Sequence, residues 1–377
     1  MICPKKYFKV FKKNDIDFFC GVPDSAIKNF ISYVENKLPK KNHLILPNEG
    51  SAIATSIGYY LATQKIPLVY MQNSGLGNAI NPLTSLVDKE VYKIPLILFI
   101  GWRGEPNFKD EPQHIKQGKI TESQLKILGI PYIVIDDNEV NSINNTIKLI
   151  SEIKKTGKTH AILSKRNIFS KSINSGNNSK ENFSREFALS HILKNLNKDD
   201  IIVSTTGKLS RELFEQRIKN NQTHENDFLT VGGMGHSSAI ALGISINKPN
   251  SNIFCFDGDG AAIMHMGIFT NIGFSRCKKF KHIIFNNGSH ESVGGQKTLG
   301  FNISFEKLSK ICGYSNSYFA DNLNSLNECL DNFININNGP SLLELKLSIN
   351  TRKNLGRPTK SPIENKLKLI DKLKSIN

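Results

Sequence analysis

Short apolar runs alternate with amphipathic or small-residue segments along most of the chain. Helical periodicity is clear over residues 49–64 and 140–154. The runs between such segments are rich in β-branched residues, as buried parallel strands are. In the first part of the chain, we expect strands at residues 17–22, 43–47, 67–71, 94–100, 131–136 and 159–164. Strand and helix units that repeat in this order predict a parallel sheet covered on both faces.

The second part of the chain repeats this alternation. Strands are expected at residues 200–205, 227–231, 252–257, 281–286 and 342–347. Helices are expected at residues 211–219, 236–246, 262–271 and 305–312, and a lysine-rich amphipathic helix is expected in the tail 351–377. The stretch 165–185 is rich in Ser, Asn and Lys without periodicity, which predicts a linker. The expected fold class is α/β, with two doubly wound parallel-sheet domains at 1–164 and 186–377 and no central third domain.

Composition narrows the class of protein. Among the 377 residues, 49 Lys and Arg against 33 Asp and Glu give a formal charge of +16. These basic residues are spread along the whole chain, so nucleic-acid binding is only a remote alternative. The longest apolar runs, such as 94–100, are too short to cross a bilayer, and the first residues lack the apolar block of a signal peptide. Six cysteines without a Cys-x-x-Cys pair favour free thiols in a reducing cytoplasm.

The strongest chemical signal lies in the second predicted domain. Gly258-Asp259-Gly260 ends a strand, and Asn286-Asn287 ends another strand after 25 intervening residues. Glycines at a strand-to-helix turn let backbone N–H groups approach a diphosphate. A carboxylate and an amide at the ends of two strands offer the hard oxygen ligands that magnesium prefers. A pair of ordinary turns is the alternative interpretation.

This spacing resembles the diphosphate and magnesium signature of thiamine-diphosphate enzymes, and the two domains would then be the pyrimidine-binding and diphosphate-binding types of that family. The resemblance implies that Asp259, Asn287 and the Ser289 carbonyl bind magnesium. It also implies cofactor contacts from the second domain, at Gly258, Gly260, Ala261 and Asn287, at Thr206 and Gly207 in a TTGK turn, and at Met234 in a GGMG segment. Gly233 stands where the family usually has a serine, which removes a hydroxyl.

Glu49 supplies the counterpart in the first predicted domain. It directly follows a predicted strand and opens a small-residue helix. The resemblance implies that its carboxyl group binds N1′ of the cofactor's aminopyrimidine and so promotes removal of the thiazolium C2 proton. The alternative is an ordinary first-turn acid favoured by the helix dipole.

Several blocks are similar to the phosphonopyruvate decarboxylase branch of this family, at residues 21–25, 70–86, 100–121, 286–296 and 355–366. The resemblance implies decarboxylation of a 2-oxoacid that carries a phosphonate, giving phosphonoacetaldehyde and CO2 within phosphonate biosynthesis. Sulfopyruvate decarboxylases share several blocks and remain the alternative. Because the family binds its cofactor between two subunits, a homodimer or larger assembly is expected.

Recognition of such a doubly anionic substrate requires cationic or amide donors. Arg103 is a candidate for gripping an anion, unless it pairs with Glu105 or Asp110, and His114 is a candidate proton shuttle. Asp24 and His290 are further catalytic candidates, although Asp24 and His114 have structural alternatives. The remaining substrate candidates are Ser25, Gln72, Asn73 and Gln296. His43, His160 and His282 lie beside predicted strands and are interpreted as structural.

Overall fold

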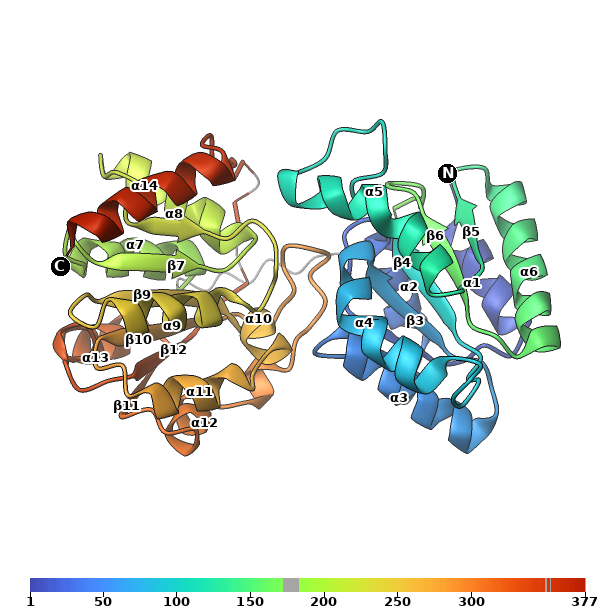
Figure 1. Cartoon of the computed structure of the whole chain (residues 1–377), viewed down its shortest axis with the longest axis horizontal. Helices are drawn as coiled ribbons and strands as arrows, with labels where there is room; N and C mark the ends of the chain where they lie inside the picture. The colour runs from blue at the N-terminus through green and yellow to red at the C-terminus, as the bar shows by residue number, and fades with distance from the viewer. Residues whose placement is uncertain (172–182, 350, 353, 377) are drawn as a thin grey trace. The chain divides into compact units, whose positions relative to one another are not determined.

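The structure is a computed structural model that describes residues 1–171, 183–349, 351–352 and 354–376 (Figure 1). A sheet of six parallel strands forms the centre of the first of its two units. Contacts divide the chain into two compact units, Met1–Ser175 with Ser292–Gln296 and Gly176–Glu291 with Lys297–Asn377. The first sheet has the order β2-β1-β3-β4-β6-β5. Its strands are β1 (Phe19–Gly21), β2 (His43–Ile45), β3 (Leu68–Gln72), β4 (Ile97–Gly101), β5 (Tyr132–Ile135) and β6 (His160–Ser164).

Helices cover both faces of this sheet. One face carries α1 (Pro4–Lys12), α2 (Lys28–Lys37) and α6 (Glu139–Thr156), and the other carries α3 (Glu49–Thr63), α4 (Leu76–Pro82) and α5 (Pro112–Ile127). Short helical segments lie at η1 (Lys40–Asn42), η2 (Asn73–Gly75) and η3 (Leu83–Val87). Successive strand residues alternate between the two cores: Phe99 packs with α1 and α2, while Leu98 and Ile100 pack on the opposite side.

The second unit contains another six-stranded parallel sheet, in the order β11-β12-β10-β9-β7-β8. Its strands are β7 (Ile201–Ser204), β8 (Asp227–Leu229), β9 (Ile253–Gly258), β10 (Phe280–Asn286), β11 (Asn316–Ala320) and β12 (Ser341–Lys346). One face is covered by α7 (Arg185–Asn195), α8 (Lys208–Lys219) and α13 (Leu323–Asn335). On the other lie α9 (Ser237–Asn247), α10 (Asp259–Met264), α11 (Ile268–Ser275), α12 (Phe305–Ile311) and α14 (Pro362–Ser375), and η4 (Gly300–Asn302) precedes α12.

The two units have the same strand order. Numbered within its own unit, each sheet reads 2-1-3-4-6-5, because β7 to β12 occupy the places of β1 to β6. The predicted fold class, two parallel-sheet α/β domains, is confirmed, and among the described residues no third domain lies between them. Most of the predicted linker, residues 172–182, lies outside the described residues. On either side of it, Phe169 and Phe183 are buried in the cores of the two units.

Two local predictions in the second unit were wrong or incomplete. The expected helix 262–271 is two helices, α10 and α11, with His265 to Gly267 between them. Glycine is a poor helix former, and Gly267 caps α11 instead of continuing α10. The edge strand β11 was not expected, because its sequence is polar and only its last residue is fully buried. The expected tail helix is present as α14, which Ser361 and Glu364 start with a reciprocal capping box.

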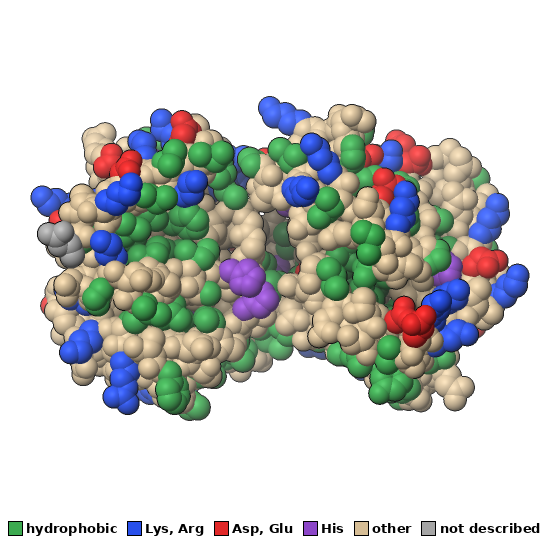
Figure 2. Space-filling view, viewed as in Figure 1, with side chains coloured by type: hydrophobic (Ala, Val, Ile, Leu, Met, Phe, Trp, Pro, Cys, Tyr) green, Lys and Arg blue, Asp and Glu red, His purple; other side chains and the backbone are tan. Residues whose placement is uncertain are grey.

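The surface agrees with the interpretation of the charge. Lys and Arg side chains are scattered over the face shown in Figure 2, among apolar and neutral polar side chains. Within the described residues, no helix is both long enough and apolar enough to cross a membrane. The six cysteines are all free thiols.

Candidate active site

In both units, the predicted site residues follow the carboxyl ends of the first four strands. In the first unit these are Asp24 and Ser25 after β1, Glu49 after β2, Gln72 and Asn73 at the end of β3, and Arg103 after β4. In the second unit they are Thr206 and Gly207 after β7, Met234 after β8, Asp259 after β9 and Asn287 after β10. This edge is where open parallel sheets bind ligands.

Glu49 is a buried carboxylic acid at the first position of α3. Asn48 caps the helix by accepting a hydrogen bond from the Ser51 amide. The Glu49 carboxylate accepts a 2.8 Å hydrogen bond from Nδ2 of Asn78 on α4. Burial raises the pKa of Glu49, and the Asn78 bond only partly opposes this. The Glu49 carboxyl group therefore keeps its proton to a higher pH than an exposed first-turn acid does.

Gly75 closes one side of the Glu49 carboxyl group. A Cβ atom at this position would overlap the carboxylate of Glu49, so only glycine allows the backbone to approach so closely. Neither Gly75 nor Asn78 was predicted as a site residue. Both lie within the QNSGLGNAINP block, but nothing in the sequence pairs them with a glutamate on another helix.

Asp24 and Arg103 belong to a second polar group in the first unit. Asp24 is 1% exposed, and its Oδ2 accepts a 2.8 Å hydrogen bond from the Ala26 amide. Its Oδ1 has no hydrogen-bond partner among the described residues. Burial raises the pKa of Asp24 to about 6, against the opposing effects of the Ala26 amide and Arg103. A carboxylate kept ionised in such a place destabilises the fold, as groups retained for function often do.

Asp24→Asn is expected to increase the free energy of unfolding at pH 8 and to lose this gain as the pH falls from about 6 to about 4. The folded-state pKa of Asp24 lies above the ordinary value, so folding disfavours its ionised form by up to about 3 kcal/mol above pH 6. Asp17→Asn is the control of opposite sign, because Lys12 holds the pKa of Asp17 low. Denaturant unfolding at several pH values measures both, and no gain for Asp24→Asn at pH 8 would contradict the assignment.

Arg103 is largely committed to neighbours in its own unit. Its Nε and Nη2 bind both carboxylate oxygens of Asp110 at 2.9 and 2.6 Å, and its Nη1 donates to Ser25 Oγ at 2.7 Å. This is the ion pair anticipated as the alternative role, while Glu105 pairs with Lys165 instead. Because a guanidinium has five N–H groups, two of them remain for a ligand.

The other candidates in the first unit have defined local roles. The Asn73 side chain bonds the backbone of Arg103 in both directions, and it also donates to Thr121 at 2.9 Å. Gln72 donates to Ser74 at 2.7 Å. Burial, aided by Arg103, lowers the pKa of His114 to about 4. This low pKa favours a neutral imidazole near pH 7, and proton transfer by His114 stays a prediction.

In the second unit, Asp259 and Asn287 lie together, as the motif predicts. Asp259 begins α10 and is 2% exposed. Its carboxylate accepts hydrogen bonds from the Asn287 backbone amide and from Thr298 Oγ1. Burial nevertheless raises the pKa of Asp259 to about 6. Asn286 instead binds Glu344 and the Gly300 carbonyl, so Asn287 alone offers its amide to a ligand.

A buried charge network fixes the orientation of Asn287. Its Nδ2 donates to Glu291 Oε2 at 3.1 Å, and the same carboxylate is paired with Arg185 Nη1 at 2.8 Å. Arg185 also binds both oxygens of Glu212 at 2.7 Å. With Nδ2 held in this way, Asn287 Oδ1 accepts a 3.1 Å hydrogen bond from the Ser289 amide, and its second lone pair is left for a cation. Arg185 was placed in the linker by the sequence, so its role could not be predicted.

The remaining predicted residues of the second unit are less constrained. Thr206 Oγ1 donates to the Val231 carbonyl at 2.8 Å, and Gly207 caps α8 with a φ of 101° that other residues rarely adopt. Met234 is partly buried. Ser289 Oγ is buried without a hydrogen-bond partner among the described residues, and so is Oε1 of Gln296, whose segment Ser292–Gln296 belongs to the first unit.

His290 lies against the glycine turn that follows β9. A Cβ atom at Gly260 would come within 2.8 Å of the His290 ring, so this glycine leaves the ring in direct contact with the turn. Burial lowers the pKa of His290 to about 4. At neutral pH the ring is therefore a neutral donor and acceptor at the edge of the site.

These side chains fit magnesium and a diphosphate. Asp259 and Asn287 supply a carboxylate and an amide oxygen, which are hard ligands. A bound cation would provide the opposite charge that the buried Asp259 carboxylate requires. At Gly300, a Cβ atom would come within 2.5 Å of Asp259 Oδ2, so the backbone there is packed directly against the carboxylate.

Two family models match the chain. One is described as "Thiamine pyrophosphate enzyme, N-terminal TPP binding domain" and matches residues 6–126. The other is described as "Thiamine pyrophosphate enzyme, C-terminal TPP binding domain" and matches residues 206–345. The chain belongs to the thiamine pyrophosphate enzyme family, and each unit carries one of its two cofactor-binding domains.

Curated relatives narrow the class to decarboxylases. The chain is 29% identical to a phosphonopyruvate decarboxylase of Streptomyces viridochromogenes, over 91% of this chain and 88% of the relative. It is 27% identical to a sulfopyruvate decarboxylase of Methanosarcina acetivorans, over 83% of each chain. A sulfopyruvate decarboxylase subunit alpha of Methanococcus maripaludis is 37% identical, over 33% of this chain and 72% of the subunit. The chain is thus a carboxy-lyase of this family.

Glu291→Gln is expected to weaken magnesium affinity by about 10- to 100-fold, because partners that orient a metal ligand contribute effects of this size. The amide oxygen can still accept from Asn287 and Arg185, which both bind Oε2 of Glu291, but the substitution removes the negative charge that pairs with Arg185 and turns the amide nitrogen toward Lys208. Magnesium titration in the presence of thiamine diphosphate, followed by calorimetry, measures the change. Glu212→Gln is the control, because Glu212 also binds Arg185, whereas Asn287 donates its hydrogen bond to Glu291. A lowered unfolding temperature with unchanged magnesium affinity for Glu291→Gln would reduce Glu291 to a structural residue.

Proposed function

We propose that this enzyme decarboxylates 3-phosphonopyruvate to phosphonoacetaldehyde and CO2, with thiamine diphosphate and Mg2+ as cofactors. The observation that carries the proposal is the match over 91% of the chain to relatives named phosphonopyruvate decarboxylase. Support from geometry comes from the buried Glu49 carboxyl group in one unit and the paired Asp259 and Asn287 in the other.

The cofactor, when bound, supplies stabilisation of the negative charge left by departing CO2. In the second unit, Asp259, Asn287 and the Ser289 carbonyl would hold the magnesium ion, and the amides of Gly260 and Ala261 would bind the diphosphate. In the first unit, Glu49 would hold a proton and exchange it at the aminopyrimidine N1′. The substrate's carboxylate C–C bond breaks, CO2 leaves, and a proton takes its place on the keto carbon.

Substrate recognition is proposed for the polar group after β1 and β4. Arg103 retains N–H groups beyond those that bind Asp110 and Ser25, and these would bind an anionic group of the substrate. Asp110 holds the guanidinium plane in position. Asp24 lies against Gly101, where a Cβ atom would overlap its carboxylate, and it would exchange a proton near pH 6.

We further propose a cytoplasmic homodimer or larger assembly, with the pyrimidine half of the cofactor on one subunit and the diphosphate half on another. The family resemblance supports this arrangement, and the six free thiols support a reducing compartment. Size-exclusion chromatography with light scattering tests the assembly. A monomer with full activity would overturn it.

Sulfopyruvate decarboxylation is the second candidate, favoured by the match over 83% of the chain to a relative of that name. The deciding experiment offers phosphonopyruvate, sulfopyruvate and pyruvate side by side to protein loaded with thiamine diphosphate and magnesium, with phosphorus NMR on the first. Preferential formation of phosphonoacetaldehyde supports a place in phosphonate biosynthesis. Preference for sulfopyruvate would keep the chemistry and change the substrate, and no turnover of any of the three would overturn the proposal.

A further inference from the structure

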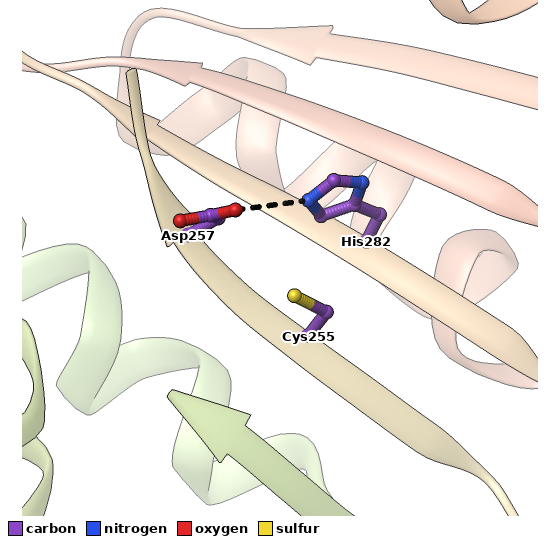
Figure 3. A group of neighbouring side chains, drawn as sticks. All are labelled: Cys255, Asp257 and His282. Carbon is purple, nitrogen blue, oxygen red and sulfur yellow. Dashed lines mark ion pairs between the residues drawn. The ribbon is translucent and has the colours of Figure 1, made fainter. Parts of the chain in front are cut away.

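Three side chains of metal-binding type lie together inside the second unit, and none of them is Asp259 or Asn287. Cys255 and Asp257 are two residues apart on β9 and face the same side of the sheet, and His282 on β10 is the register partner of Cys255 (Figure 3). All three side chains are wholly buried. They lie on the face covered by α9, α11 and α12, next to Phe269 and Tyr314.

The three donor atoms surround one point. Sγ of Cys255, a carboxylate oxygen of Asp257 and a ring nitrogen of His282 all lie within 4.8 Å of one another. The distance from Asp257 Oδ2 to His282 Nε2 is 3.8 Å. A hydrogen bond between nitrogen and oxygen requires about 2.7–3.2 Å, so these atoms are too far apart to share a proton directly. Nitrogen and oxygen ligands of one tetrahedral zinc ion lie roughly 3.4 Å apart, so a small approach of these two atoms would bring both onto one ion.

The two atoms of Asp257 and His282 that face each other lack hydrogen-bond partners, whereas the other carboxylate oxygen and the other ring nitrogen are hydrogen-bonded. Asp257 Oδ2 and His282 Nε2 have no hydrogen-bond partner among the described residues. Asp257 Oδ1 accepts a hydrogen bond from the Gly258 amide at 3.1 Å, and His282 Nδ1 is hydrogen-bonded to the Tyr314 hydroxyl at 3.1 Å. Metal-binding histidines and carboxylates are typically oriented by such outer partners. Two buried polar atoms left facing each other without a partner would otherwise destabilise the fold.

We propose that Cys255, Asp257 and His282 form a second metal site, which binds a zinc-like divalent transition-metal ion. A thiol sulfur, an imidazole nitrogen and a carboxylate oxygen form a ligand set suited to zinc, whereas magnesium prefers oxygen ligands alone. On binding, the Cys255 thiol loses its proton to the buffer and its sulfur bonds the ion. Three protein ligands leave the fourth tetrahedral position for a water molecule.

The location suggests a structural purpose. Asp257 is joined directly to Gly258, whose amide it binds, so an ion on Asp257 would fix the end of β9 from which Asp259 projects. Because the three side chains are wholly buried, we expect the ion to enter while the chain folds rather than by exchange with the native protein. This site does not depend on the proposed substrate.

The test is metal analysis of the full-length protein after expression in zinc-supplemented medium and exhaustive dialysis. We expect close to one zinc ion per chain in the wild-type protein, and its loss in Cys255→Ser and His282→Gln. Cys329→Ser, on the distant α13, is the control and should keep the ion. Expression in cobalt medium provides a second readout, a thiolate-to-cobalt charge-transfer band that Cys255→Ser alone among the cysteine variants removes.

Two results would overturn the proposal. Wild-type protein without transition metal after zinc expression, together with no charge-transfer band after cobalt expression, would leave Cys255, Asp257 and His282 as a metal-free polar cluster. Metal retained in full by Cys255→Ser would place the ion elsewhere. If the variants fail to fold, the cobalt spectrum of the wild-type protein still decides the question.

Discussion

Glu49→Gln is expected to lower the turnover number for the 2-oxoacid substrate by about 10²- to 10⁴-fold, the usual contribution of a positioned proton-transfer group. The amide keeps the shape of the side chain and can still accept the hydrogen bond from Asn78. It cannot hold an exchangeable proton. Binding of thiamine diphosphate, measured by calorimetry, should therefore change far less than the rate of CO2 release in a steady-state assay.

Glu139→Gln is the matched control for this variant. Glu139 is also the first residue of a helix capped by an asparagine, Asn138, but it is bonded to Lys6 at the surface. The two substitutions remove the same charge from the same local structure. Turnover close to wild type is expected for Glu139→Gln, and an equally active Glu49→Gln would remove Glu49 from proton transfer.

Asp259→Asn is expected to abolish most of the rise in unfolding temperature that thiamine diphosphate and magnesium together produce. Ligands that bind only the folded state stabilise it by about 2.7 kcal/mol at a concentration one hundred times Kd. The loss of the carboxylate charge weakens the magnesium site, and the diphosphate then loses its cation. Without ligands, the variant should be at least as stable as wild type near neutral pH, because burial already disfavours the ionised Asp259.

Asp200→Asn is the control for burial without metal binding. Asp200 is 3% exposed in the same unit, and burial raises its pKa too, but it precedes β7 and so lies at the opposite edge of the sheet. Thermal unfolding with and without both ligands should show the full shift for Asp200→Asn. A full shift for Asp259→Asn as well would refute its role as a magnesium ligand.

The sequence was sufficient to predict those strands and strand-end residues whose positions follow from the local hydrophobic pattern. The central strand β4 is a continuous apolar run and β9 begins with one, so their places and their parallel arrangement follow from the pattern. Asp259 and Asn287 could be placed together because each ends a strand of one parallel sheet. The edge strand β11 pairs with a neighbour on one side only and has a polar sequence, so the hydrophobic pattern did not predict it.

The comparison of Glu49 with Glu139 shows the limit of local sequence. Both follow an asparagine that caps their helix, and both begin that helix. Only tertiary packing separates them: burial raises the pKa of Glu49, while Lys6 lowers that of Glu139. The family resemblance, and not the Asn-Glu pair, identified the catalytic candidate.

Contacts between distant segments were also beyond prediction. The ion pair of Arg185 with Glu291 joins residues 106 positions apart, and the hydrogen bond of Asn78 to Glu49 joins residues 29 positions apart. The pKa of His114 depends on burial and on Arg103, which a motif does not reveal. Such long-range contacts and pKa shifts arise from tertiary packing, which a local sequence motif does not specify.

The shared 2-1-3-4-6-5 order of the two sheets suggests an evolutionary history. An ancestral gene for one such sheet, copied and joined in tandem, would leave this arrangement. The copies would then have diverged at equivalent strand ends: the third strand leads to Gln72 in one unit and to Asp259 in the other. Divergence at such strand ends would have left Glu49 in one copy and Asp259 in the other, on a strand order that both copies keep.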